Sequence, residues 1–299
     1  MPALLVLLAV TAVWGVTFVQ VKDAVAVYPL FAFLALRFAI ASGTLAIPGV
    51  RRVSALGRTG VAEGVLAGAL LGAGYALQTA GLQRTSVSST GFITGMYVVL
   101  TPLLAFACFR VRASAGAWAG VTLATVGLAL LAGVHRGALV GDLLVLGGAA
   151  VYSLQIVLME RYAPRYDAIA FTLVEMLTAF GGLLAVALAL GDLHAPHGWT
   201  VWGALLVTGV FASALAFLAQ TWAQRRTTAT RTALAFSLEP VWAAIFGISL
   251  AGDRLGPAGW AGCAAIMAGI LVAELTGRRL DGVRQRAEAP ASPAPERGR

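Results

Sequence analysis

The chain has 299 residues, of which 59% are hydrophobic and only 11% are charged. Soluble globular domains carry roughly 25% charged residues, so this composition excludes an ordinary water-soluble fold. The net charge of +8 is carried by a strongly apolar chain, and we interpret it as a signal of membrane topology. We expect no nucleic acid among its partners.

Long apolar segments follow one another along the chain and predict ten membrane-spanning helices. About twenty helical residues cross the hydrocarbon core of a bilayer. The predicted spans lie near residues 3–21, 28–48, 62–82, 89–109, 114–134, 141–159, 168–190, 201–224, 232–251 and 257–276. The apolar runs are continuous rather than alternating, and backbone groups in lipid must pair internally, so helices are expected rather than strands. The predicted fold class is an all-α integral membrane protein.

The residue pattern of the first half recurs in the second half. Trp118-Ala119-Gly120 recurs 142 positions later as Trp260-Ala261-Gly262. Three earlier markers recur at an interval of 138: Trp14 with Tyr152, Arg37 with Glu175, and Pro102 with Pro240. Because five helices are an odd number, the second copy must enter the bilayer from the opposite side. The sequence therefore predicts two inverted five-helix repeats, residues 1–134 and 135–276, an arrangement typical of secondary transporters.

Basic residues are distributed unevenly between the predicted loops. With the N-terminus in the cytoplasm, ten arginines fall in cytoplasmic loops: Arg51, Arg52, Arg58, Arg110, Arg112, Arg161, Arg165, Arg225, Arg226 and Arg231. The external loops then hold four basic residues, Lys22, Arg84, Arg136 and Arg254. The positive-inside rule therefore predicts a multi-pass protein of the plasma membrane, or inner membrane, with both termini cytoplasmic. Residues 277–299, rich in Arg, Pro and Ala, are expected to form a disordered cytoplasmic tail.

Several short motifs occur in the same order as in a known family. They are Trp14-Gly15-Val16-Thr17-Phe18, Leu36-Arg37-Phe38, Glu239-Pro240, Gly252-Asp253-Arg254-Leu255, and Trp260-Ala261-Gly262 with Gly269. Over roughly residues 3–276 the chain resembles the EamA branch of the drug/metabolite transporter superfamily. The resemblance implies a ten-helix bundle, competent as a monomer or weak dimer, that exports or imports small metabolites such as amino acids. The family usually has Glu where this chain has Asp253, so we expect no tight geometric role for this acid.

Two prolines lie inside predicted spans. Pro102 and Pro240 fall in the fourth and ninth spans, and each lacks an N–H and clashes with the carbonyl four residues before it, that of Val98 or Phe236. Helix breaks at matched positions in two repeats are typical of a transport site, so we predict that both prolines act as hinges. The alternative is a packing kink without ligand contact.

Three charged residues lie deep inside predicted spans: Arg37, Glu175 and Glu239. A charge near the bilayer centre costs at least about 2.5–3.5 kcal/mol, so such residues face partners or a wet cavity. We hypothesise that Arg37 and Glu175 pair or share one polar network; alternatively, each finds its own backbone or hydroxyl partner. Glu239 is the candidate proton- or substrate-responsive group, because a low-dielectric cavity favours its neutral form. The alternative for Glu239 is a fixed hydrogen bond to the kinked backbone.

Polar and aromatic residues at helical spacing outline a predicted cavity. The candidate substrate-binding residues are Trp14, Thr17, Tyr75, Gln78, Thr94, Tyr97, Thr101, Tyr152, Gln155, Gln220 and Phe236. Aromatic rings and amides together suit an amphipathic metabolite. The alternative is ordinary interhelical hydrogen bonding. The glycines of Gly64-Gly68-Gly72 and Gly120-Gly127 predict close helix contacts.

The leading hypothesis is a secondary transporter of small organic metabolites, such as amino acids, that works by alternating access around a midplane cavity. Export is the favoured direction, protons are an open choice of partner, and lipid surrounds the protein. The alternatives are a non-transporting membrane subunit or receptor and, with the least support, a membrane enzyme, because no intramembrane histidine or hydrolase motif occurs. We expect no cofactor and no metal, since His194 and His197 fall in an external loop.

Overall fold

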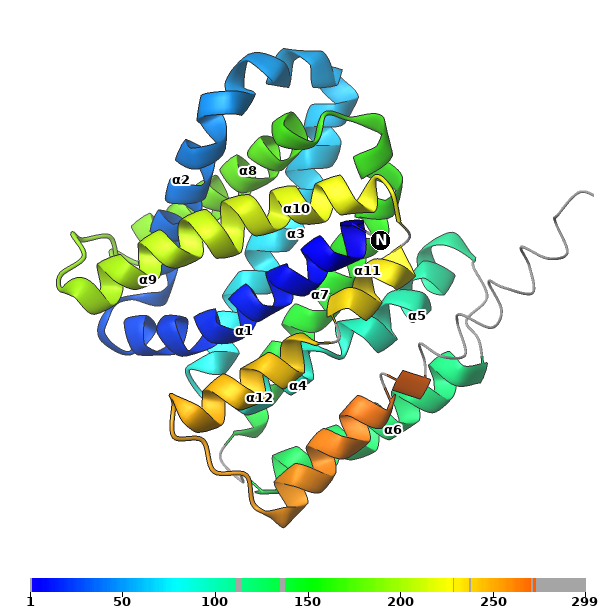
Figure 1. Cartoon of the computed structure of the whole chain (residues 1–299). Coiled ribbons are helices and arrows are strands. Elements are labelled where there is room, and N and C mark those ends of the chain that lie inside the picture. The colour runs from blue at the N-terminus through cyan, green and yellow to red at the C-terminus, as the bar shows by residue number, and fades with distance from the viewer. Residues whose placement is uncertain are drawn as a thin grey trace, which may run out of the picture.

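The protein is a bundle of helices (Figure 1). The structure is a computed structural model that describes residues 2–110, 115–134, 138–227, 229–236, 238–269 and 271–272. Within these ranges every regular element is helical, in agreement with the predicted all-α class. The predicted tail 277–299, the end of the predicted tenth span, and Arg112 and Arg136 of the charge count lie outside the described residues.

The first half of the chain contains six α-helices. They are α1 (Pro2–Val27), α2 (Leu30–Gly49), α3 (Gly57–Leu82), α4 (Val87–Thr94), α5 (Tyr97–Phe109) and α6 (Ala115–Val134), with the 3₁₀ segment η1 (Val50–Leu56) between α2 and α3. The predicted fourth span, 89–109, is therefore two helices. Gly95 and Met96 separate α4 from α5, so the helical path is interrupted inside the apolar segment.

The second half follows the same order. It contains α7 (Leu139–Tyr162), η2 (Ala163–Arg165), α8 (Ala168–Ala189), α9 (Trp199–Gly209), η3 (Val210–Leu215), α10 (Ala216–Gln224), α11 (Ala229–Phe236) and α12 (Glu239–Ser249), followed by helical residues 257–269. The predicted ninth span, 232–251, is again two helices, α11 and α12. The predicted eighth span is a continuous path in which η3 is a π-helical turn between α9 and α10.

Six helical segments of the described chain are long and apolar enough to cross a membrane, and one of them, Leu30–Leu82, contains both α2 and α3. These segments agree with a membrane protein. Another of the six, Val87–Phe109, contains both halves of the first broken helix, α4 and α5, whereas α11, α12 and the last helix are not among them. The count of ten spans therefore stays a prediction.

Helix boundaries repeat at the intervals found in the sequence. Helices α4 and α11 both begin and end 142 positions apart, and α5 and α12 begin 142 positions apart. Helices α2 and α8 begin 138 positions apart. Both breaks, Gly95–Met96 and the chain between Phe236 and Glu239, thus fall at equivalent places. Two broken helices at matched positions are the feature that the sequence predicted.

The prolines themselves are not equivalent, and the prediction that they occupy matched positions is wrong. Pro240 is the second residue of α12, a position where proline is tolerated because its missing N–H would be unpaired anyway. Pro102 lies in the middle of α5, six residues after the break at Met96. At the interval of 142 that relates these helices, Pro240 corresponds to Val98. The hinge of the first half is therefore expected at Gly95–Met96 instead of Pro102.

The two halves interlock through close helix contacts. Helix α3 packs along α7 and α8, α2 along α8, and α4 and α1 along α12. Figure 1 shows α6 beside the last helix, which is coloured orange, at one edge of the bundle. A Cβ added at Gly127 would lie 2.6 Å from the carbonyl oxygen of Gly262, and one added at Gly269 would lie 2.6 Å from that of Gly120. This reciprocal contact is what a two-fold relation produces, and it confirms the predicted packing role of Gly120 and Gly127.

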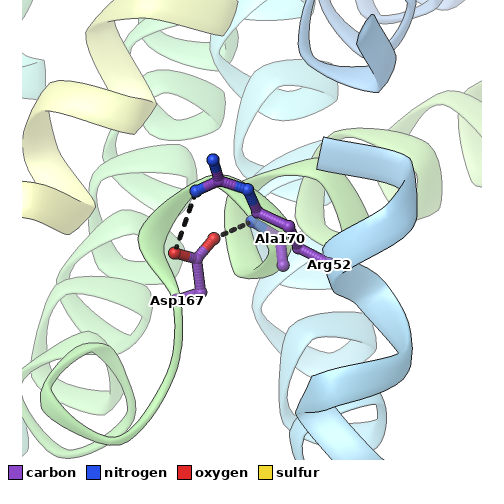
Figure 2. A network of polar contacts seen from close by, with 3 residues as sticks. All are labelled: Arg52, Asp167 and Ala170. Carbon is purple, nitrogen blue, oxygen red and sulfur yellow. Dashed lines mark hydrogen bonds and ion pairs between the residues drawn. The ribbon is translucent and has the colours of Figure 1, made fainter. Parts of the chain in front are cut away.

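The start of α8 is fixed by a capping contact (Figure 2). Asp167 accepts a hydrogen bond from the backbone N–H of Ala170 at 3.0 Å and so satisfies one of the free donors of the first turn. Arg52 of η1 lies 3.5 Å from the same carboxylate, an exposed ion pair worth about 0–1 kcal/mol. The cap sets where α8 begins and therefore how deep Glu175, two turns later, lies.

Candidate functional site

A central cavity of about 50 Å³ lies where the two halves meet. Ten of the eleven predicted binding residues line it: Trp14, Thr17, Tyr75, Gln78, Thr94, Tyr97, Tyr152, Gln155, Gln220 and Phe236. Arg37 and Glu239 line it as well. Thr101 does not line it; its hydroxyl donates to the carbonyl oxygen of Tyr97, one turn earlier, at 2.6 Å. The cavity has room for only a few water molecules, so a metabolite could enter only after the walls move apart.

Much of the lining consists of equivalent residues from the two halves. At the interval of 142, Gln78 corresponds to Gln220 and Tyr97 to Glu239, and all four line the cavity. The equivalent residues Tyr97 and Glu239 also touch, since the Tyr97 hydroxyl donates to Oε2 of Glu239 at 2.7 Å. A residue can contact its own equivalent only close to the axis that relates the copies. The cavity therefore lies at the centre of the repeat arrangement.

Aromatic rings form a continuous wall of the cavity. The Trp14 ring lies 4.9 Å from that of Phe236 and 5.5 Å from that of Phe217, measured between centroids. The Tyr75 ring lies 5.5 Å from that of Tyr152 in an edge-to-face arrangement. Phe217 also lines the cavity, and it lies three residues before Gln220 on the same helical face. Such a wall offers apolar area and ring faces to a ligand.

The π-helical turn η3 supplies a carbonyl group to the cavity wall. The wider turn displaces the backbone hydrogen bonds of the helix, a feature that often occurs at functional sites. The carbonyl oxygen of Ala212 accepts the indole N–H of Trp14 at 2.9 Å and lies 3.5 Å from Nη2 of Arg37. One unusual turn therefore positions two cavity-lining side chains that come from different helices.

Arg37 is buried and is held by hydroxyl groups rather than by a carboxylate. Its Nε donates to Oγ of Ser213 at 2.8 Å, and its Nη2 donates to the Tyr75 hydroxyl at 3.0 Å. The guanidinium carbon also lies 4.3 Å from the centroid of the Tyr75 ring. Both ion pairs found among the described residues are elsewhere. The hypothesised pair with Glu175 is therefore wrong, and the alternative of separate hydroxyl and backbone partners holds for Arg37.

Glu175 begins a chain of amide side chains that reaches the cavity. Its Oε1 accepts from Nε2 of Gln155 at 2.7 Å, and Oε1 of Gln155 accepts from Nε2 of Gln220 at 3.1 Å. Gln220 also donates to Oε1 of Gln224 at 3.0 Å. The hydrogen-bond partner of Glu175 is therefore Gln155 and not Arg37. Oε2 of Glu175 is buried and has no hydrogen-bond partner among the described residues.

Glu239 and Tyr97 connect the cavity to the break between α11 and α12. The Tyr97 hydroxyl lies 2.7 Å from Oε2 of Glu239 and 3.0 Å from the carbonyl oxygen of Phe236, the last residue of α11. The carbonyl of Phe236 was predicted to lose its helical partner, and it is here an acceptor for a side chain. A tyrosine has one hydroxyl hydrogen, so it fully serves only one of these two acceptors at a time.

A second amide joins the remaining polar groups of the cavity. Nε2 of Gln78 donates to the hydroxyl of Thr94 at 2.9 Å, and the Tyr152 hydroxyl donates to Oε1 of Gln78 at 3.1 Å. The hydroxyl of Thr17 instead donates to the carbonyl oxygen of Trp14 at 2.9 Å, within its own helix. The polar side chains are therefore held in place before any ligand binds.

Asp253 has the tight geometric role that sequence analysis did not expect. Its Oδ2 accepts from the backbone N–H of Ser88 at 2.7 Å, in the first turn of α4. Ser86 caps the same helix through the N–H of Ser89 at 3.0 Å. Asp253 therefore ties the loop after α12 to the N-terminus of α4, whose free donors and dipole favour an acid. The shorter side chain reaches this donor because the two segments already lie close together.

Comparison with known proteins agrees with this architecture. The family model described as the EamA-like transporter family matches residues 1–133 and 139–275. An uncharacterized transporter of Archaeoglobus fulgidus is 29% identical over 267 residues, which are 89% of this chain and 83% of that protein. A crystal structure of another protein is similar in fold over 94% of this chain and 98% of that chain, with a TM-score of 0.70 and 20% identity. The chain therefore belongs to the EamA-like transporter family and is a membrane transporter.

Proposed function

We propose that the protein is a secondary transporter of small organic metabolites, such as amino acids, that works by alternating access, with export as the favoured direction. One observation carries the proposal: a buried cavity lined by equivalent residues of both halves, with Arg37 and Glu239 in its wall. Polar and charged groups buried in a membrane bundle mark substrate pathways. Binding sites of secondary transporters lie between repeats at broken helices, and this cavity has the same position relative to α4, α5, α11 and α12.

The proposed arrangement in the membrane is two inverted repeats of five spans. Residues 1–134 form the first repeat and residues 135–276 the second, in the plasma membrane with both termini cytoplasmic. The reciprocal contacts of Gly120 with Gly269 and of Gly127 with Gly262 support a two-fold axis between the repeats. One chain supplies both halves of the cavity lining, so a monomer or a weak dimer would suffice for transport.

Equivalent contacts near the two ends of the bundle support a rocking motion. Near one end, Nζ of Lys22 donates to the carbonyl oxygen of Thr85, just before α4, at 2.7 Å. Near the other, Glu160, which is 138 positions after Lys22, accepts from the backbone N–H of Ala229 at the start of α11 at 3.1 Å. Each contact ties the end of a long helix to the beginning of a broken one. Opening the cavity to one side would break one contact and leave the other intact.

Proton coupling would operate through Tyr97. When Glu239 is ionised, the Tyr97 hydroxyl donates to the carboxylate, and the carbonyl of Phe236 loses its strongest donor. When Glu239 is neutral, its own O–H donates to Tyr97, which frees the tyrosine hydrogen for Phe236. Protonation would thus change the hydrogen bonding at the break between α11 and α12. The other ionisable side chains in the same cavity lining are those of Tyr75, Tyr152 and Arg37.

The test is substrate counterflow in liposomes that contain the purified protein. Liposomes are loaded with a mixture of unlabelled amino acids, and uptake of each labelled amino acid from a dilute outside solution is measured. We expect transient, saturable accumulation of at least one of them, which protein-free liposomes do not show. Absence of counterflow for amino acids and for a second panel of organic acids and sugars would contradict the proposed function and favour a non-transporting membrane subunit.

A further inference from the structure

We propose that Arg37 is the anion-binding residue of the cavity and that the transported molecule is a small monocarboxylate with an apolar body. The inference rests on the proposed transport cavity and specifies the chemistry of its ligand. It starts from the fact that Arg37 is 3% exposed and lines the cavity, although neither of the two buried carboxylates near the site bonds to it.

No carboxylate among the described residues lies within ion-pair distance of Arg37. Ser213, Tyr75 and the carbonyl of Ala212 are neutral acceptors that occupy Nε and Nη2. A buried cation is costly unless it is both hydrogen-bonded and paired with an opposite charge. The neutral acceptors fulfil the first condition only. A ligand that brings a negative charge would fulfil the second, which gives the cavity a specific reason to prefer an anion.

One nitrogen of the guanidinium remains available for this ligand. Nη1 has no hydrogen-bond partner among the described residues, whereas Nε and Nη2 are engaged. Ser213 and Tyr75 hold the plane of the guanidinium, so Nη1 keeps one direction before the ligand binds. They are positioning residues in this scheme. Because the group is already oriented, little entropy is lost when an anion binds.

The rest of the lining specifies what kind of anion fits. Arg37 is the one cationic side chain among the cavity-lining residues that the structure describes, and Glu239 is in the same lining. A dianion such as a phosphate monoester would meet a single cation and a nearby acid, so a monoanion is favoured. The rings of Trp14 and Phe217 lie in the wall and suit an apolar body. A carboxylate on a small aliphatic or aromatic group combines these features.

The experiment compares acids with their uncharged or non-anionic amides. Purified protein in detergent is melted with phenylacetate, 4-methylpentanoate or L-leucine, and with the primary amide of each. We expect the acids to raise the melting temperature of the wild-type protein and the amides to leave it unchanged, because only the acids bring the compensating charge. Equal stabilisation by acids and amides, or no stabilisation by any of the three acids, would overturn the proposal.

Variants assign the effect to Arg37. Arg37→Gln is expected to weaken acid binding roughly 10- to 100-fold, as for a lost charge-assisted hydrogen bond, and Arg37→Lys to restore part of it. The matched control is Arg58→Gln, which removes an exposed arginine outside the cavity and is expected to bind acids normally. Tyr75→Phe and Ser213→Ala retain the charge and are expected to weaken acid binding by roughly 3- to 10-fold. If Arg37→Gln does not fold, Tyr75→Phe and Ser213→Ala provide the test. Normal acid binding by both variants would then refute the assignment of the anion site to Arg37.

Transport in liposomes separates this inference from the proposed function. If phenylacetate binds but neither it nor any amino acid, organic acid or sugar of the two panels shows counterflow, the proposed function fails while the anion site stands. If phenylacetamide and phenylacetate are exchanged equally well by the wild-type protein and by Arg37→Gln, transport stands and the role of Arg37 fails.

Discussion

Replacement of Gly68 by alanine is expected to lower the free energy of unfolding by about 1–3 kcal/mol, because the added methyl group has no space. Its Cβ would meet the carbonyl oxygen of Glu175 and would lie 2.7 Å from Cβ of Thr178 on α8. Backbone atoms cannot rotate away as a flexible side chain can, so α3 and α8 would have to separate. The separation would also displace Glu175 and its hydrogen bond from Gln155.

Gly43 offers a matched control for this substitution. It is also a helical glycine, but an added Cβ there would meet no atom within 4 Å. Gly43→Ala is expected to be neutral or to stabilise by up to about 1 kcal/mol, since alanine is the better helix former. Thermal unfolding of both variants in the same detergent measures the difference. If Gly68→Ala melts at the same temperature as Gly43→Ala, the close contact between α3 and α8 does not exist as described.

Glu239→Gln is expected to abolish the response of transport to a proton gradient while leaving exchange of substrate intact. The glutamine amide can donate to the Tyr97 hydroxyl as the neutral acid would, and it cannot release a proton. The variant should therefore stay in the hydrogen-bonding state of the protonated carboxyl at every pH. Uptake into liposomes is measured with an imposed pH gradient and, separately, as counterflow without a gradient. Accumulation by the variant should fall to the level seen without a gradient.

Tyr97→Phe distinguishes the hydrogen-bond relay from a simple loss of charge. It keeps the carboxyl group of Glu239 but removes the hydroxyl that joins it to the carbonyl of Phe236. We expect this variant to exchange substrate more slowly and to respond weakly to the gradient. If Glu239→Gln accumulates substrate in proportion to the pH gradient, as the wild-type protein does, Glu239 has no part in coupling.

Helix positions were predictable from the sequence because they depend on apolar run length, which the bilayer sets. The runs that became α1, α2, α3, α7 and α8 all lie close to the predicted spans. Most of the cavity lining was also predictable, since polar and aromatic residues spaced at three or four share one helical face. Gln78 and Gln220 were identified in this way.

The features that were missed depend on local register and on side-chain reach. Pro102 and Pro240 were paired at an interval of 138, whereas the helices that contain them are related at 142, because the intervening loops differ in length. The ion pair of Arg37 with Glu175 was expected from their similar depth. A similar depth in the membrane does not determine which side chains lie between the two charged groups. Arg37 bonds to Ser213, and Glu175 bonds to Gln155. No sequence signal identified the π-helical turn that carries Ser213.

Accessibility of two single cysteines tests most directly whether the two halves are inverted about an axis in the membrane plane. Cys108 is first replaced by serine and Cys263 by alanine. One cysteine is then introduced at an exposed position, as Ala26→Cys in one variant and as Pro164→Cys in another. Intact cells are treated with a membrane-impermeant maleimide before and after permeabilisation. We predict labelling of position 26 in intact cells and of position 164 only after permeabilisation. Labelling of both positions from the same side would contradict the inverted arrangement, and with it the proposed mechanism.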